Sequence, residues 1–211
     1  KFIEGGLPKE KFEFKTNFLH PAPESGQGKG GFALFVGRLS PEKGIDTLLS
    51  AWETLHTRIP LKIVGAGPLT PEVEAATQRL ANVEYLGRRP LSEVYDLMGE
   101  AKFFVFSSKW YETFGRVAIE AYAKGTPILA SRIGAITELV KPYETGLLFE
   151  PGDANDLITQ VEWVLNHPTA WQQIRYQARQ EFENRYTAAD NYKRLIEIYQ
   201  KAIALKAPAM A

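Results

Sequence analysis

The sequence predicts an α/β protein with a Rossmann-like, three-layer α/β/α arrangement, in which about six parallel strands lie between helices. Three observations predict this class. Short, continuous apolar runs recur along the chain, each run is followed by Gly or polar residues, and stretches with helical periodicity separate the runs. Continuous apolar runs are typical of strands that are buried on both faces of a parallel sheet.

The apolar runs are the predicted strands. Each is four or five residues long, far shorter than the roughly 20 apolar residues that a membrane-spanning helix needs, so we predict no transmembrane segment. In chain order the runs are 32–36 (FALFV), 61–64 (LKIV), 83–86 (VEYL), 103–106 (FFVF), 127–130 (PILA) and 146–149 (GLLF).

The predicted helices carry apolar residues three or four positions apart. Residues 44–55, 91–98 and 115–122 are expected to connect successive strands, and the PGD turn at 151–153 to begin a helix that ends before Pro168. Two further helices follow, and we expect their apolar side chains to pack in the core. These are Trp171, Ile174, Ala178 and Phe182 on the first, and Tyr192, Leu195, Ile196, Tyr199 and Ile203 on the second.

The chain is predicted to contain one domain, residues 31–211, preceded by a linker and remnant of another region, residues 1–30. The boundary is placed at the Pro-, Gly- and Ser-rich segment 21–31, which is typical of a loop. Because the sequence begins with Lys1 and its opening lacks the apolar stretch of a signal peptide, we expect the chain to continue a longer protein.

Composition excludes several classes of function. The 25 Lys and Arg residues balance 25 Asp and Glu residues, so no basic excess predicts nucleic-acid binding. There is no Cys and there are three scattered His, which excludes disulfides, thiolate zinc sites and a cysteine nucleophile and argues against any metal site.

Residues that follow the strands are the candidates for ligand binding, because ligands bind at the carboxyl edge of an open parallel sheet. The loop at 37–44 (GRLSPEKG) places Arg38 and Lys43 before a helix. It lacks the Gly-Lys-Ser/Thr ending of a Walker A loop. Two cations beside the start of a helix would suit a bound diphosphate. The alternative interpretation is that Arg38 and Lys43 are two solvated cations on the surface.

The turn at 65–68 (GAGP) follows the second strand. A dinucleotide fingerprint requires a third Gly where Thr70 stands, so we reject an NAD site. Two interpretations of this glycine-rich segment stay open: it lets the backbone approach a ligand closely, or it is an ordinary tight turn.

The segment 107–127 is the most specific stretch. Glu112 precedes a helix expected to begin near Gly115, and Glu120 lies inside that helix. The amides of Gly115, Arg116 and Val117 would form an anion site at the helix N-terminus. If the chain were helical from Glu112 to Glu120, this separation of eight positions would place the two carboxylates about 12 Å apart, whereas the two carboxylates of a glycosidase lie roughly 5 Å apart in retaining enzymes and 6.5–9.5 Å apart in inverting ones. This spacing favours two hydrogen-bond acceptors for one extended ligand over hydrolysis.

Together these segments resemble, in order and spacing, the C-terminal half of retaining glycosyltransferases of family 4, which have the GT-B fold. The similarity covers about residues 30–165, and its most specific part is the pair Glu112 and Glu120 with seven residues between them. The segments are GRLSPEKG, IVGAGP, YLGR, SSKWYETFGRVAIEAYAKGTPILAS, RIGAITELV, which contains Glu138, and TGLLFEPGD.

The resemblance implies roles for individual residues. Arg38 and Lys43 would hold the donor's diphosphate and stabilise the leaving group, and Glu112 would sit at the donor sugar; these three are the implied catalytic residues. Glu120 would accept hydrogen bonds from the ribose. Backbone groups of Thr113, Phe114 and Gly115 would bind sugar hydroxyls, amides of Arg116 and Val117 would bind phosphate, Gly87, Arg88 and Leu91 would lie by the nucleobase, and Gly37 and Gly65 would line the cleft.

The function implied is transfer of a hexose from a nucleotide sugar, expected to be UDP-glucose or a similar UDP-sugar, in polysaccharide biosynthesis. The acceptor, a glycan or a lipid-linked molecule, would bind mostly to a missing N-terminal domain, so peripheral membrane contact stays open. No metal or cofactor is expected, and we expect a cytoplasmic location. A non-catalytic nucleotide-sugar-binding module and a sugar-nucleotide epimerase are the alternatives. Lys109-Trp110-Tyr111 and Gly134-Ala135 depart from the common family pattern, which leaves the sugar open.

Overall fold

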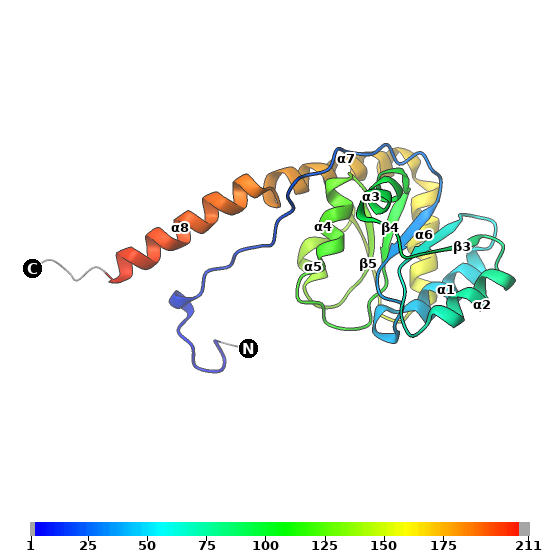
Figure 1. Ribbon diagram of the computed structural model, residues 1–211, viewed down its shortest axis with the longest axis horizontal. Helices are drawn as coiled ribbons and strands as arrows, with labels where there is room; N and C mark the ends of the chain where they lie inside the picture. The colour runs from blue at the N-terminus through cyan, green and yellow to red at the C-terminus, as the bar shows by residue number, and fades with distance from the viewer. Residues whose placement is uncertain (1–2, 207–211) are drawn as a thin grey trace, which may run out of the picture.

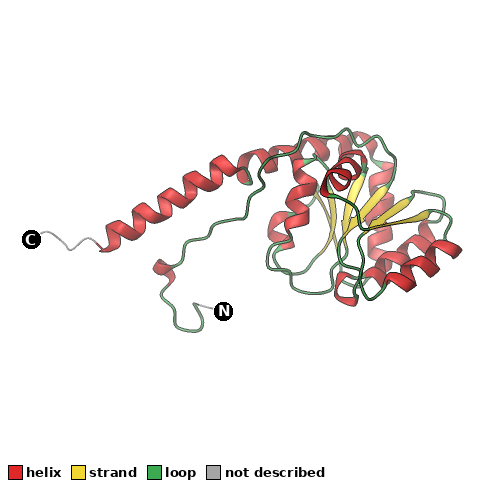
Figure 2. Ribbon diagram, viewed as in Figure 1, coloured by secondary structure: helices red, strands yellow, loops and turns green. Residues whose placement is uncertain are grey.

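The computed structural model describes residues 3–206 and contains a six-stranded parallel sheet with helices on both faces (Figures 1 and 2). The strand order β3-β2-β1-β4-β5-β6 is that of a Rossmann fold, so the predicted class is confirmed. All six predicted strands form, within one residue of the expected bounds. They are β1 (Ala33–Val36), β2 (Leu61–Val64), β3 (Val83–Gly87), β4 (Phe103–Phe106), β5 (Ile128–Ser131) and β6 (Gly146–Phe149).

Helices cover the sheet in two layers, each with its own apolar core. The pleat sends Ala33 and Phe35 of β1 into one core cluster and Leu34 into the other. The first cluster is completed by α1, α2 and α6, and the second by α3, α4 and α5. The helices are α1 (Ile45–Leu55), α2 (Thr70–Arg79), α3 (Leu91–Glu100), α4 (Arg116–Ala123), α5 (Ile136–Leu139), α6 (Ala154–Asn166), α7 (Pro168–Arg185) and α8 (Ala188–Lys206), with 3-10 turns η1 (Lys9–Lys11) and η2 (Pro41–Lys43).

The predicted helices between strands are confirmed, and two others were not predicted. The side chain of Asp153 caps α6 as expected, accepting hydrogen bonds from the amides of Asn155 and Asp156 at 2.9 and 3.0 Å. The additional helices are α2 and the one-turn α5. Only Val73 and Ala76 of α2 are buried, so its sequence carries a weak apolar stripe.

Helices α7 and α8 behave differently. The predicted apolar face of α7 is buried, and it spans both cores, because Trp171 and Ile174 enter one cluster and Ala178 and Phe182 enter the other. The expectation that α8 packs in the core is wrong. Tyr192, Tyr199 and Ile203 are exposed, and Leu195 and Ile196 are only partly buried. The physical reason is that α8 projects away from the sheet beside the N-terminal segment (Figure 1).

The segment before β1 runs along α8 and then over the body of the molecule (Figure 1). Along α8, Asn191 donates to the carbonyl of Thr16 at 2.8 Å, and Arg194 donates to the carbonyl of Phe14 at 2.7 Å. Nearer β1, the amide of Gly28 donates to Gly99 at 2.8 Å. Residues 1–2 of the predicted linker region and residues 207–211 of the predicted domain lie outside the described residues.

Candidate functional site

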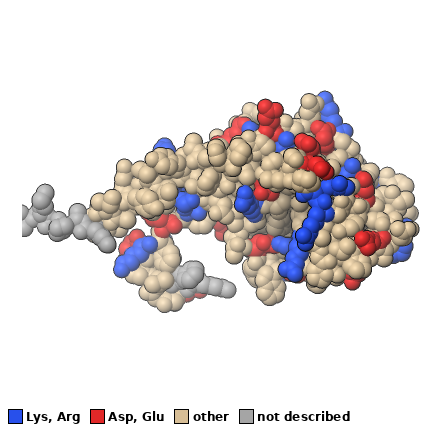
Figure 3. Space-filling view, viewed as in Figure 1, with Lys and Arg blue, Asp and Glu red and all other residues tan. Residues whose placement is uncertain are grey.

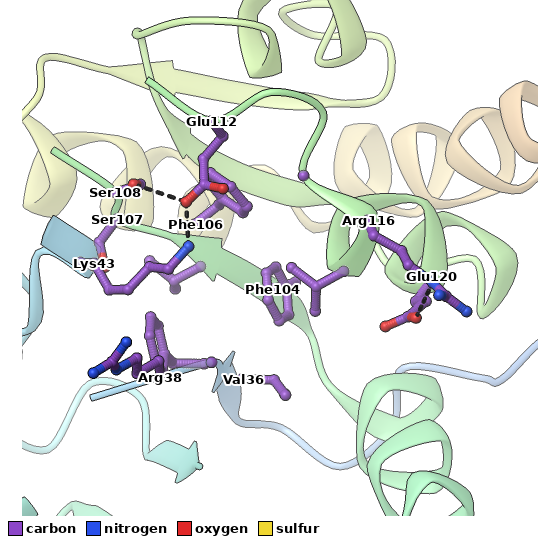
Figure 4. Close-up of a pocket in the computed structure, with 15 residues that line it drawn as sticks. Val36, Arg38, Lys43, Phe104, Phe106, Ser107, Ser108, Glu112, Arg116 and Glu120 are labelled. Carbon is purple, nitrogen blue, oxygen red and sulfur yellow. Dashed lines mark hydrogen bonds and ion pairs between the residues drawn. The ribbon is translucent and has the colours of Figure 1, made fainter. Parts of the chain in front are cut away.

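A cavity of about 380 Å³ lies at the carboxyl edge of the sheet, where β1 and β4 end (Figure 4). In the strand order, the chain continues from β1 toward β2 on one side and from β4 toward β5 on the other. Ligands bind at such a switch point between adjacent strands in open parallel sheets. The cavity is lined by Phe35, Val36, Gly37, Arg38, Lys43, Phe104, Val105, Phe106, Ser107, Ser108, Glu112, Gly115, Arg116, Val117 and Glu120.

The loop after β1 is fastened to the end of β4. Ser107 Oγ donates to the carbonyl of Lys43 at 2.8 Å, and Ser108 Oγ and the amide of Lys109 donate to the carbonyl of Glu42 at 3.1 and 2.8 Å. Gly44 permits this contact, because a Cβ there would lie 1.9 Å from the carbonyl oxygen of Ser107. Its φ of 67° also favours glycine. These contacts fix the position of Lys43 in the cavity wall.

Lys43 and Glu112 form an ion pair at one end of the cavity (Figure 4). Their side chains are 28% and 24% exposed, so both remain accessible to a ligand. Ser108 Oγ also donates to Glu112 Oε1 at 3.3 Å. Arg38 lines the same cavity from the β1 loop. The site therefore offers two cations and one carboxylate held by a hydroxyl.

The other end of the cavity is formed by α4. The helix begins after Gly115, whose φ of 77° turns the chain into it, and Arg116 and Val117 of its first turn line the cavity. The first amides of a helix lack partners within it and attract anions. Glu120, whose side chain is 13% exposed, lies 3.3 Å from Arg116 Nε. Burial raises the pKa of Glu120, and the charge of Arg116 opposes that rise.

Only Glu120 of the carboxylate pair is helical. Glu112 lies in the loop between β4 and α4, four residues before the helix starts, so the helical estimate of about 12 Å between the two does not apply. The structure nevertheless separates them, since Figure 4 places Glu112 and Glu120 at opposite ends of the cavity.

Eight of the fourteen predicted site residues line the cavity, and six do not. Gly65 is not a lining residue but packs against one, because a Cβ on Gly65 would lie 1.8 Å from the carbonyl oxygen of Gly37. The amide of Gly65 donates to the carbonyl of Gly87 at 2.8 Å. Phe114 packs edge-on against Tyr186. The side chains of Arg88, Leu91 and Thr113 are exposed and outside the cavity.

Ser107 and Ser108 were not predicted as site residues. Both are buried, and their hydroxyls connect the β1 loop to Glu112 as described above. Their position directly after an apolar strand was a usable signal, because polar residues there fall at the carboxyl edge of the sheet. The apolar floor of the cavity is formed by Phe35, Phe104 and Phe106. Apolar periodicity predicts that these residues lie in strands, but it does not show that they line a cavity.

Figure 3 shows how the charged side chains are distributed on one face of the molecule. On the face shown in Figure 3, acidic and basic side chains are interspersed, apart from one continuous band of Lys and Arg on the body that contains the sheet.

Within residues 3–206, no group of three or more His, Asp or Glu side chains is arranged to hold a metal ion. No helix in the same range combines the length and apolarity needed to cross a membrane.

Comparison with known proteins gives a consistent set of relatives. The model of a family described as "Glycosyl transferases group 1" matches residues 20–181. The chain is 34% identical to an uncharacterized glycosyltransferase, MJ1178, of Methanocaldococcus jannaschii over 67% of the chain and 40% of that protein. It is 36% identical to a glycogen synthase of Mycobacterium tuberculosis over 70% of the chain and 37% of that protein. The chain thus spans about two fifths of the length of these relatives.

A solved structure of similar fold is HepE of Anabaena in complex with UDP and glucose. The TM-score is 0.71 and the sequence identity is 25%, and the match covers 81% of this chain and 48% of that one.

Proposed function

The chain belongs to the group 1 glycosyl transferases, and from this premise we propose that it is the donor-binding part of a retaining hexosyltransferase. The donor would be UDP-glucose or a similar UDP-sugar, and the acceptor a glycan or a lipid-linked molecule bound largely by residues outside this chain. One observation carries the proposal: Arg38, Lys43 and the first turn of α4 meet in one cavity that has a carboxylate at each end. The similarity to a protein solved with UDP and glucose supports it.

The charges in the cavity match the parts of such a donor. The diphosphate would bind to Arg38, Lys43 and the α4 amides, the ribose to Glu120, and the hexose beside Glu112. As the anomeric C–O bond breaks, its electrons would leave with the diphosphate, the anomeric carbon would form a new bond to an acceptor hydroxyl oxygen, and the hydroxyl proton would pass to the departing phosphate. Fixed cations would stabilise the developing negative charge of the diphosphate without requiring reorganisation of water. Gly87, Arg88 and Leu91, which lie outside the cavity, would contact the nucleobase beyond the ribose end.

The ion pair between Lys43 and Glu112 would change when the donor binds. Without ligand, the ammonium group of Lys43 and the carboxylate of Glu112 neutralise each other's charge, and this ion pair keeps the Lys43 side chain in the cavity. A diphosphate would draw Lys43 toward the phosphate oxygens, which leaves Glu112 free to accept hydrogen bonds from hexose hydroxyls. We place this chemistry in the cytoplasm, where nucleotide sugars are made.

Calorimetric titration with UDP tests the site. We expect micromolar or weaker binding, reduced roughly tenfold or more in Arg38→Ala and in Glu120→Ala, because each loses a hydrogen bond to a charged group. Arg58→Ala is the matched control, since Arg58 lies between α1 and β2 at the opposite edge of the sheet. Unchanged affinity in both site variants would overturn the assignment.

A further inference from the structure

Two neighbouring aromatic side chains near the cavity are exposed. Trp110 and Tyr111 are 68% and 73% exposed, and they precede Glu112 in the loop between β4 and α4. Most other exposed large apolar side chains of residues 3–206 lie on the N-terminal segment or on α8. Large aromatic surfaces are normally buried in a core or an interface, so an adjacent exposed pair at a site indicates ligand contact.

The backbone that carries the pair is held in place. The carbonyl of Trp110 lies 3.3 Å from Ser108 Oγ, whose one proton it shares as an acceptor with Glu42 and Glu112, and Lys109 Nζ lies 2.5 Å from Asp46 Oδ2 of α1. On the other side, a Cβ on Gly134 would lie 3.3 Å from Cα and Cδ1 of Tyr111. The loop is thus fixed between α1 and the turn after β5 while both rings face solvent, a preorganised arrangement that lowers the entropy cost of binding.

The position of the loop indicates which part of a substrate the rings would meet. Trp110 and Tyr111 adjoin Glu112, which lies at the Lys43 end of the cavity, whereas Glu120 and Arg116 mark the opposite end (Figure 4). In the proposed donor orientation, the Glu112 end holds the hexose and the Glu120 end holds the nucleoside. The rings therefore lie beside the sugar end, where an acceptor must approach the anomeric carbon.

A pyranose ring matches such a surface. One face of many hexopyranoses presents several C–H groups, and these pack on the negative face of an aromatic ring while the hydroxyls remain free for hydrogen bonds. We propose that Trp110 and Tyr111 form a stacking platform for a pyranose unit of the acceptor, which makes the acceptor a glycan-containing molecule. This inference rests on the donor site proposed above.

Tryptophan fluorescence offers a selective test. Of the four tryptophans in the sequence, Trp52 and Trp171 are buried, and Trp163 is partly buried and stacked on His167 with ring centroids 4.5 Å apart. Acrylamide quenching therefore reports mainly on Trp110. The chain would be titrated with maltotriose and with methyl α- and β-D-glucopyranoside and mannopyranoside, both in excess UDP and without UDP, and quenching would be measured at each concentration.

We expect at least one sugar to protect Trp110 from quenching. Tyr111→Ala should weaken this sugar binding about fivefold, within the range of one aromatic contact, and leave UDP affinity unchanged. Tyr111→Phe, which keeps the ring, should bind as the unaltered chain does. Tyr176→Ala, which removes an exposed aromatic side chain on α7, is the matched control and should have no effect. Equal melting temperatures would show that all variants fold.

The outcomes separate the two proposals. If UDP binds and every sugar leaves quenching unchanged, the platform is overturned and the donor site stands. If a sugar protects Trp110 but UDP does not bind, the donor site is overturned and the aromatic sugar site stands. Equal sugar affinity in Tyr111→Ala and the unaltered chain would remove Tyr111 from the platform.

Discussion

Glu112 and Glu120 are the same residue type in one cavity but have different surroundings. Glu112 accepts from Ser108 and pairs with Lys43, both fixed by the contact between the β1 loop and β4. Glu120 is more buried, and its partner Arg116 is largely exposed to solvent, which screens the charge. Burial therefore dominates at Glu120 and raises its pKa.

The raised pKa of Glu120 predicts a pH-dependent effect of its replacement. The folded chain binds the Glu120 proton more tightly than the unfolded chain, so this group stabilises folding most below its unfolded pKa. The contribution is lost as the pH rises through the folded pKa. Glu120→Gln should therefore gain melting temperature relative to the unaltered chain as the pH rises from about 4 to about 7.

Glu53→Gln is the control for this measurement, because Glu53 is an exposed residue of α1 paired with exposed Arg79. Its melting curve should follow that of the unaltered chain at every pH. A melting-temperature difference for Glu120→Gln that stays constant with pH would contradict the assigned effect of burial.

At the scale of elements, the site depends on the junction between the β1 loop and the end of β4. Hydrogen bonds from Ser107, Ser108 and Lys109 converge on the carbonyls of Glu42 and Lys43. No side chain fits between the two segments at Gly44. The junction therefore brings two loops that are more than sixty residues apart in the chain into one rigid wall.

Gly44→Ala should disrupt this junction. The added Cβ meets a backbone oxygen at 1.9 Å and the residue keeps a φ of 67°, so two penalties add. Gly31→Ala is the matched control, because Gly31 has a φ of 70° but no heavy atom within 4 Å of the added Cβ. In urea unfolding, Gly44→Ala should cost about 1–3 kcal/mol more than Gly31→Ala. Equal costs would show that the contact is not tight.

At the scale of the whole molecule, the body around the sheet differs from the projecting pair formed by α8 and the N-terminal segment (Figure 1). Within the described residues, α7 buries its apolar stripe against both cores, while α8 leaves Tyr192, Tyr199 and Ile203 exposed. The chain spans about two fifths of the length of the relatives that it matches.

This difference predicts unequal effects of large-to-small substitutions. Phe182→Ala on α7 should lower the free energy of unfolding by about 3–5 kcal/mol, because it opens a cavity in the core. Tyr199→Ala on α8 should change it by no more than about 0.5 kcal/mol. Urea unfolding at two protein concentrations measures both. A large, concentration-dependent cost for Tyr199→Ala would instead reveal self-association through α8.

Local patterns of apolar residues were enough to predict the sheet and most of the helices around it, because buried strands and amphipathic helices each have a characteristic spacing of apolar residues. Arg38, Lys43 and Glu112 were predicted as site residues because each lies in a loop that follows a strand at the same edge of the sheet, and Glu120 because it lies in the helix after the last of these loops; all four line one cavity. The three-dimensional arrangement was needed to show that Glu112 pairs with Lys43, that Gly44 and Ser107 join the two loops, and that α8 leaves Tyr192 and Tyr199 exposed. These features depend on contacts between segments distant in the chain, and an amphipathic pattern does not specify which surface, if any, covers it.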